Sequence, residues 1–131
     1  MNFSKYIGLP YKNLGRDFDG IDCYGILFLI FKEERNIILP DFTELKYDKD
    51  WYKSENHIID NIYNWEVVNP PYKVFDGLIF YGGCNNTVAN HIGMMINDNS
   101  FIHISDKYSS KVDRLSDYWI YRIYKGMRYI G

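Results

Sequence analysis

The sequence predicts an α+β domain in which N-terminal helices pack on a central antiparallel β-sheet. Residues 22–35 open with an aspartate suited to cap a helix, and their apolar centre, ILFLIF, is typical of a helix buried on all sides. The second half of the chain instead contains short runs rich in β-branched and aromatic residues, separated by turn residues. Helices first and strands afterwards favour an α+β arrangement.

The individual elements follow from periodicity and turn residues. Residues 1–20 are rich in glycine and proline turns, and the helix at 22–35 comes next. Over residues 50–65, apolar residues recur at helical spacing and predict a second, amphipathic helix. The predicted strands, which form an antiparallel meander, lie at 77–82, 91–97, 100–105 and 118–125.

Size and composition exclude several classes of protein. The 131 residues suffice for one domain with its own core, so we expect a single domain over residues 1–131. A net charge of −2 without a lysine–arginine cluster argues against a nucleic-acid partner. The longest apolar run, YGILFLIF, is far shorter than the roughly 20 residues of a membrane span. We expect no membrane contact, no signal peptide, reduced thiols and a monomer.

Cys23 has two interpretations. A lone cysteine is more often a small buried hydrophobe than a nucleophile. At the first turn of the helix at 22–35, however, unpaired backbone N–H groups favour a thiolate and lower the pKa of a thiol. Cys84, in the loop sequence YGGCNN, is a rival nucleophile without a helix to support it.

A nucleophilic thiol needs a base, and two histidines lie on consecutive predicted strands. His91 opens one strand and His103 lies within the next, whereas His57 falls in the second helix as a boundary residue. A two-residue loop at 98–99 would place His91 and His103 on opposite faces of the sheet. A three-residue loop at 97–99 pairs His103 with Gly93 and makes the histidines diagonal neighbours. We predict the odd-length loop, because its Asn and Asp residues tolerate the left-handed conformation.

Together these segments resemble the NlpC family of papain-like cysteine peptidases, which cut peptidoglycan stem peptides. The opening motif is GLPYKNLGRDFDGIDCYG, the central strand is FDGLIFY, and the histidine motifs are NHIGMMINDNSFIH. The tail YWIYRIYKGMRYIG resembles the last strand of that family. The resemblance spans nearly the whole chain in the same order and implies a papain-like, NlpC-type fold.

The resemblance also implies roles for individual residues. Cys23 matches the nucleophile, His91 the base, and His103 the third polar residue that orients the base. Tyr11 matches a tyrosine whose hydroxyl lies by the nucleophile and helps to polarise the substrate carbonyl. Asp22 matches an acidic residue that holds the amino end of the stem peptide in some members.

Two departures from the family pattern concern specificity. Tyr24 replaces the serine that usually follows the cysteine, and DCYG resembles the variant in bacteriophage tail-associated members. Tyr24 therefore bears on substrate preference. The central Gly-Asp pair is inverted to Asp-Gly at 76–77. Neither departure removes a catalytic group.

The resemblance implies hydrolysis of the bond between D-γ-glutamate and a diamino acid, with no metal or other cofactor. The histidines and cysteines show no zinc-type spacing either. A bare catalytic domain without a signal suggests a phage tail component in the virion, made in the host cytoplasm, with tail proteins as partners. An injected wall-degrading toxin and a phage lysis enzyme are alternatives.

Two further readings use the same fold differently. The domain would serve as a non-catalytic tail-assembly factor if catalysis were vestigial. Lipid acyl transfer is disfavoured, because relatives with that activity are circularly permuted and place histidine before cysteine, whereas Cys23 precedes His91.

Overall fold

The computed structural model describes residues 2–40, 64–81 and 89–131, with the side chains of residues 89 and 90 left out. A 3₁₀ turn at Ser4–Tyr6 opens the chain, and a two-stranded ribbon of β1 (Arg16–Asp17) and β2 (Gly20–Ile21) leads into α1 (Cys23–Arg35). His57, Cys84 and nearly all of the predicted second helix lie outside the described residues. Trp65 belongs to a strand, so a helix reaching that residue was wrong.

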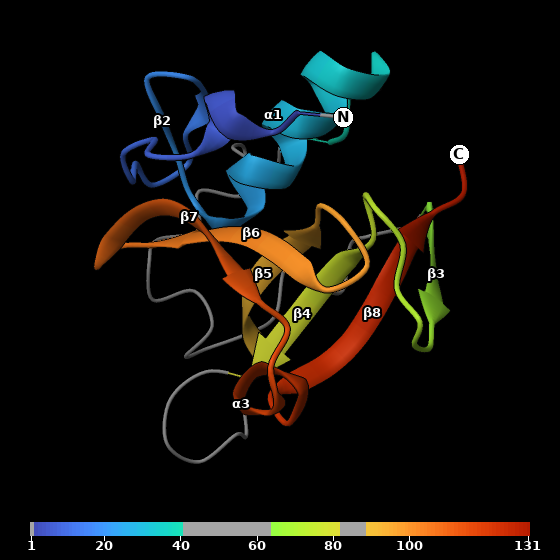
Figure 1. Cartoon of the computed structure of the whole chain (residues 1–131). Helices are drawn as coiled ribbons and strands as arrows, with labels where there is room; N and C mark the ends of the chain where they lie inside the picture. Colours follow the sequence, from blue (N-terminus) through green and yellow to red (C-terminus); the bar gives the residue numbers. More distant parts are fainter. Residues whose placement is uncertain (1, 41–63, 82–88) are drawn as a thin grey trace.

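The central sheet has six antiparallel strands in the order β3-β8-β4-β5-β6-β7 (Figure 1). The α+β prediction is confirmed. The bounds are β3 (Trp65–Val68), β4 (Gly77–Tyr81), β5 (Ala89–Met95), β6 (Ser100–Ser105), β7 (Tyr108–Arg114) and β8 (Ile123–Tyr129).

The strand predicted at 118–125 was wrong in its first half. Residues Asp117–Ile120 form the short helix α3, and β8 begins only at Ile123. The amide of Ile120 bonds to the carbonyl of Ser116, and that of Tyr121 to Asp117, so the local turn replaces strand pairing. This turn allows Trp119 to pack against Phe80 and Phe101, a tertiary contact that overrides β propensity.

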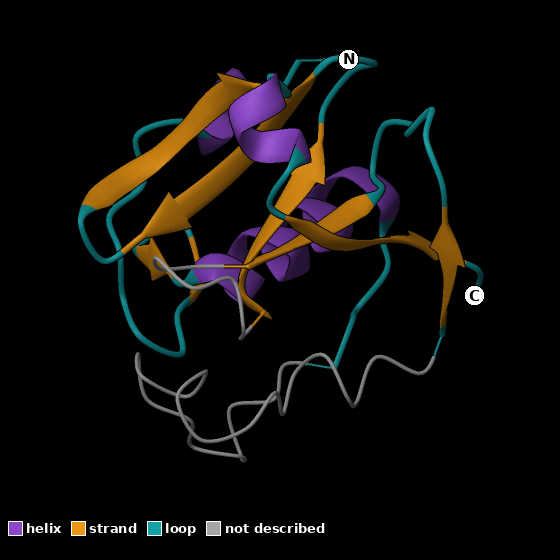
Figure 2. Ribbon diagram, turned by 90° about the horizontal axis from the view of Figure 1, so that it is seen from below, coloured by secondary structure: helices purple, strands orange, loops and turns teal. Residues whose placement is uncertain are grey.

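The two faces of the sheet carry different hydrophobic clusters. The larger cluster joins α1 to one face, through residues such as Leu29, Phe31, Ile79 and Ile92. The smaller cluster, on alternate strand residues such as Phe80 and Phe101, is covered by Trp119 of α3. Figures 1 and 2 show the helices as separate layers against this sheet. Among the described residues, no helix is both long and apolar enough to cross a bilayer.

A close backbone contact fixes the N-terminal segment to α1. A Cβ atom at Gly25 would lie 2.1 Å from the carbonyl oxygen of Gly15, and one at Gly15 would lie 2.2 Å from that of Gly20. Both distances are far below van der Waals contact, so only glycine permits this approach. The first turn of α1 is thereby held against the preceding ribbon.

We expect Gly25→Ala to destabilise the fold by about 1–3 kcal/mol, because the added methyl group must displace backbone. In an open helix the same change would be stabilising by up to about 1 kcal/mol. Urea unfolding monitored by circular dichroism measures the free energy of unfolding. Glu33→Ala, on the exposed part of α1, is the control and should stay within about 0.5 kcal/mol of wild type. A more stable Gly25→Ala protein would contradict the prediction.

Candidate active site

Cys23 is the first residue of α1 and is a free, partly exposed cysteine. Asp22 caps the helix, and its Oδ1 accepts a 2.7 Å hydrogen bond from the amide of Gly25. The predicted helix start is confirmed. The backbone N–H groups of Ile92 and Tyr24 both interact with the thiol of Cys23. Since Ile92 follows His91 in β5, this contact places the nucleophile candidate next to the histidine strand.

The β5–β6 hairpin brings His91 and His103 together. His103 pairs with Gly93, Ile102 with Met94, and Phe101 with Met95. The amide of Ile96 then bonds to the carbonyl of Ser100, so residues 97–99 form the loop, as the sequence predicted. The Nε2 atom of His91 lies 2.7 Å from the Nδ1 atom of His103. The predicted register is confirmed.

Aromatic rings enclose the two imidazoles. Trp119 stacks on the ring of His91 with the planes at 27°, and meets the ring of His103 edge-on at a centroid distance of 5.0 Å. Phe101 lies 4.6 Å from the ring of His103, and Phe80 lies 6.0 Å from that of His91. These contacts limit rotation of both imidazoles. Trp119 is not among the predicted site residues, because the sequence predicts a strand at 118–125.

Two further polar residues complete the cluster and were also missed. The Oδ2 atom of Asp113 lies 2.6 Å from Nε2 of His103, and the hydroxyl of Tyr108 lies 3.1 Å from its Nδ1. Both residues come from β7, for which the sequence analysis predicted no strand. The alternation of Tyr108, Ser110 and Val112 in that segment is the signal that was available.

Desolvation by the surrounding protein favours the uncharged forms of Cys23 and His91 in the free protein, although both residues are partly exposed. It raises the pKa of the Cys23 thiol to about 12, and the negative charge of Asp22 adds to the increase. It also lowers the pKa of His91 to about 3, aided by the neighbouring His103. The amide of Tyr24 at the helix start lowers the thiol pKa, as expected. Desolvation and Asp22 outweigh this effect together with those of the Ile92 amide and Arg16.

The comparisons with known proteins identify the family of this chain. Residues 8–128 match the model of the NlpC/P60 family. The chain belongs to the NlpC/P60 family. A search of curated protein sequences finds no significant match.

Solved structures of NlpC/P60 proteins share the fold. The NlpC/p60 domain of the peptidoglycan hydrolase SagA is similar with a TM-score of 0.62 and 18% identity, over 95% of this chain and 91% of that one. An NlpC/P60 family protein from Bacillus cereus is similar with a TM-score of 0.64 and 21% identity, over 96% of this chain and 37% of that one. NlpC1 from Trichomonas vaginalis is similar with a TM-score of 0.58 and 16% identity, over 96% of this chain and 41% of that one. This chain therefore spans well under half of the latter two proteins.

Asp22 of this NlpC/P60 domain is committed to internal contacts. The residue is 2% exposed, and besides Gly25 it accepts hydrogen bonds from the guanidinium of Arg16 at 2.8 Å and the amide of Leu14 at 3.0 Å. These bonds cap α1 and tie down the N-terminal segment. The contact with the amino end of a substrate that the resemblance implies for Asp22 stays a prediction.

The two tyrosines of the resemblance are placed differently from each other. Tyr24 is 2% exposed, and its hydroxyl donates a 2.6 Å hydrogen bond to the carbonyl of Pro40, so its ring packs in the core. Its bearing on substrate preference stays a prediction. Tyr11 is partly exposed and forms a parallel bridge with Ile21, two residues before Cys23. Tyr11 thus lies on the segment that adjoins the nucleophile candidate.

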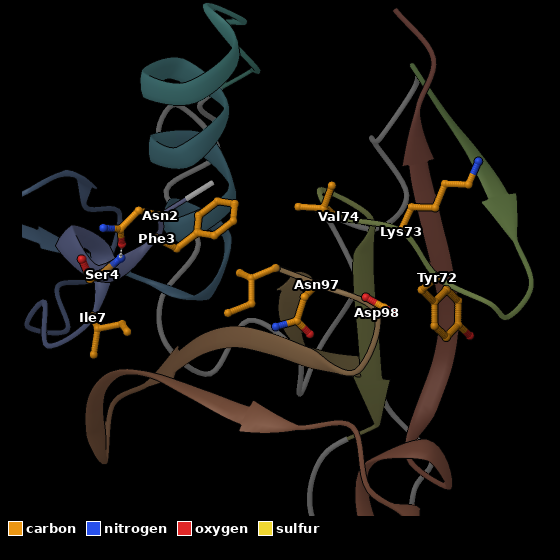
Figure 3. A pocket seen from close by; sticks show the side chains of 10 residues that line it. Asn2, Phe3, Ser4, Ile7, Tyr72, Lys73, Val74, Asn97 and Asp98 are labelled. Atoms are coloured by element: carbon orange, nitrogen blue, oxygen red, sulfur yellow. Dashed lines mark hydrogen bonds between the residues drawn. The ribbon is translucent and has the colours of Figure 1, made fainter.

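One hollow of the described surface lies away from this cluster. It measures about 910 Å³ and is open to solvent. Figure 3 shows its lining, which comes from the N-terminal segment, the loop before β4 and the β5–β6 hairpin loop. None of Cys23, His91 and His103 lines it. This hollow is therefore not the candidate active site.

The pKa directions predict how Cys23 reacts with iodoacetamide. Since the thiol titrates near pH 12 and His91 near pH 3, we expect slow alkylation near pH 7 and a rate that rises with pH. Mass spectrometry of a Cys84→Ser protein measures the modification of Cys23 alone. A rate plateau between pH 4 and 8 would indicate a stable thiolate–imidazolium pair and contradict this prediction.

Proposed function

We propose that this NlpC/P60 domain is a cysteine endopeptidase that hydrolyses peptidoglycan stem peptides, at the bond between D-γ-glutamate and a diamino acid. The observation that carries the proposal is the 2.7 Å contact between His91 and His103. The partly exposed thiol of Cys23, at a helix start, bonds to the amide of Ile92, the residue after His91. A base oriented by a second polar group is the arrangement that activates a thiol. The similarity to the NlpC/p60 domain of the peptidoglycan hydrolase SagA supports the substrate class.

In the first step, the sulfur of Cys23 attacks the scissile carbonyl carbon. The thiol proton passes to Nδ1 of His91, the ring nitrogen that does not face His103. Because the resting pair is uncharged, charge separates only as the bond to carbon forms. Backbone N–H groups at the start of α1 stabilise the negative charge on the carbonyl oxygen. Tyr11, from the adjoining segment, is the candidate for a further donor.

In the second step, the tetrahedral intermediate collapses. The proton on Nδ1 of His91 moves to the leaving amine, the C–N bond breaks, and a thioester to Cys23 remains. Water then attacks the thioester while His91 accepts one of its protons. That proton returns to the sulfur as the C–S bond breaks, which releases the acid and restores the thiol. The sequence of steps uses no cofactor.

We place the domain in a phage tail, where it opens the cell wall locally. The support is the DCYG sequence at residues 22–25, which resembles that of tail-associated members of the family. Tail proteins are then its partners, and the virion is its location. A toxin injected into a competing cell and a lysis enzyme use the same chemistry, so the location requires its own test, namely detection of the chain in purified virions.

We expect Cys23→Ala to abolish hydrolysis of purified peptidoglycan while leaving the circular dichroism spectrum unchanged. Mass spectrometry of the products detects new amine termini and identifies the bond that is cut. Cys84→Ala is the matched control and should retain wild-type activity. Hydrolysis by Cys23→Ala would move the nucleophile elsewhere.

We expect His103→Ala to reduce kcat by about 10- to 1,000-fold without abolishing turnover, because an orienting group matters less than the base. The loss should be smaller than that of His91→Ala, measured on the same soluble stem peptide. Equal activity of His103→Ala and wild type would remove His103 from the mechanism.

A non-catalytic assembly role is the competing proposal for this fold. Under that reading, the wild-type protein releases no new amine termini from muropeptides but co-purifies with a tail protein. The intact set of Cys23, His91 and His103 favours catalysis.

A further inference from the structure

We propose that Asp113 is a positioning residue for catalysis, which acts through His103 to set the protonated nitrogen and the orientation of His91. Asp113 contacts neither the nucleophile candidate nor a reacting atom in the described structure. It lies at the far end of a chain of ring contacts that begins at His91. The inference rests on the proposed function of the Cys23–His91 pair.

The distances determine which nitrogen of each ring carries hydrogen. The hydrogen bond to His103 and the nearby Lys111 outweigh the effect of burial and lower the pKa of Asp113, so it is a carboxylate and only accepts hydrogen bonds. Nε2 of His103, at 2.6 Å, must therefore be the donor. A neutral imidazole has one donor and one acceptor nitrogen, so Nδ1 of His103 is an acceptor.

The same reasoning extends to His91. Its Nε2 lies 2.7 Å from the acceptor Nδ1 of His103 and must donate. Nδ1 of His91 is then without hydrogen and holds a free lone pair. That nitrogen is the one required to take the proton of Cys23. Asp113 thus selects, across two rings, the form of His91 that works as a base.

The hydroxyl of Tyr108 lies 3.1 Å from Nδ1 of His103, but a hydroxyl can donate or accept and does not select a form of the ring. The carboxylate of Asp113 makes that selection. If the carboxylate were absent, His103 could carry hydrogen on Nδ1, and His91 would have to reverse its hydrogen bond. His91 would then hold hydrogen on Nδ1 and lose its function as a base.

The register of β6 and β7 builds the contact into the sheet. His103 pairs with Lys111 and Phe101 pairs with Asp113, so Asp113 is the diagonal neighbour of His103 on the same face. The charged groups around His103 are Asp113 and Lys111, with the Lys111 ammonium 3.5 Å from the Asp113 carboxylate. His91 and Tyr108 are the other titratable neighbours. Asp113 supplies the negative charge that balances His91 once it becomes an imidazolium.

Nitrogen NMR of the histidine rings tests the inference without a substrate. In a His57→Gln protein labelled with ¹⁵N-histidine, only the ring nitrogens of His91 and His103 give signals. At pH 7 we expect both rings to show hydrogen on Nε2 and none on Nδ1. In Asp113→Asn the amide is a weaker acceptor and also donates, so we expect both rings to shift toward hydrogen on Nδ1. Asp98→Asn, which removes the same charge from the exposed hairpin loop, should leave both rings unchanged.

Kinetics on a soluble stem peptide give the second readout. We expect Asp113→Asn to lower kcat by about 10- to 100-fold and to change KM by less than twofold. This loss is smaller than the roughly 10⁴-fold loss for the aspartate of serine proteases, because Asp113 acts through one more ring. Asp113→Glu keeps a carboxylate and should recover at least half of the lost activity on a logarithmic scale.

The outcomes separate this inference from the proposed function. Ring shifts in Asp113→Asn without hydrolysis by the wild type would support the positioning role and refute the proposed function. Hydrolysis by the wild type, with unchanged rings and a kcat within twofold in Asp113→Asn, would overturn the role of Asp113. A loss in Asp98→Asn equal to that in Asp113→Asn would also overturn it, because net charge alone would then explain the effect.

Discussion

The register of the β5–β6 hairpin is the constraint on which the site depends. Side chains alternate between the faces of a strand, so a shift of one residue would send His91 and His103 to opposite sides of the sheet. The three-residue loop at 97–99 excludes that shift and yields the 2.7 Å contact between the rings. The pairing of β6 with β7 then adds Asp113 on the same face. The geometry of the candidate site is thus set by backbone pairing rather than by the side chains themselves.

The position of the nucleophile candidate, Cys23, is fixed by contacts at the start of α1. Asp22 caps the helix while accepting bonds from Arg16 and Leu14, and Gly25 lets the helix touch the preceding segment. The thiol of Cys23 interacts with the Ile92 amide, next to His91. Two elements that are each local in sequence, the capped helix α1 and the β5–β6 hairpin, therefore meet at Ile92 of β5. This locality explains why both could be predicted.

The features of the site that could be predicted from the sequence and those that could not differ in physical origin. The helix at Cys23 and the loop at 97–99 follow from capping and turn chemistry, which act over a few residues. Asp113 and Trp119 depend on long-range packing. The edge strand β7 is mostly polar, and α3 replaces strand pairing because Trp119 fills a space beside the imidazoles. In the sequence, the aromatic residues at 118–125 favoured a strand over the helix α3.

Asp22 has opposing effects on Cys23: it stabilises the helix that positions the thiol, and it disfavours the thiolate. The carboxylate of Asp22 caps the helix that presents Cys23, yet its negative charge raises the thiol pKa. Arg16, 2.8 Å from Asp22, offsets part of this effect but not the larger effect of burial. The Cys23–His91 pair is consequently uncharged at rest, and the proposed attack must create charge on both residues. In that mechanism the carboxylate of Asp113 stabilises the cation that forms on His91, at the other end of the histidine pair from the thiolate. The carboxylate of Asp22, next to Cys23 in the chain, opposes formation of the thiolate.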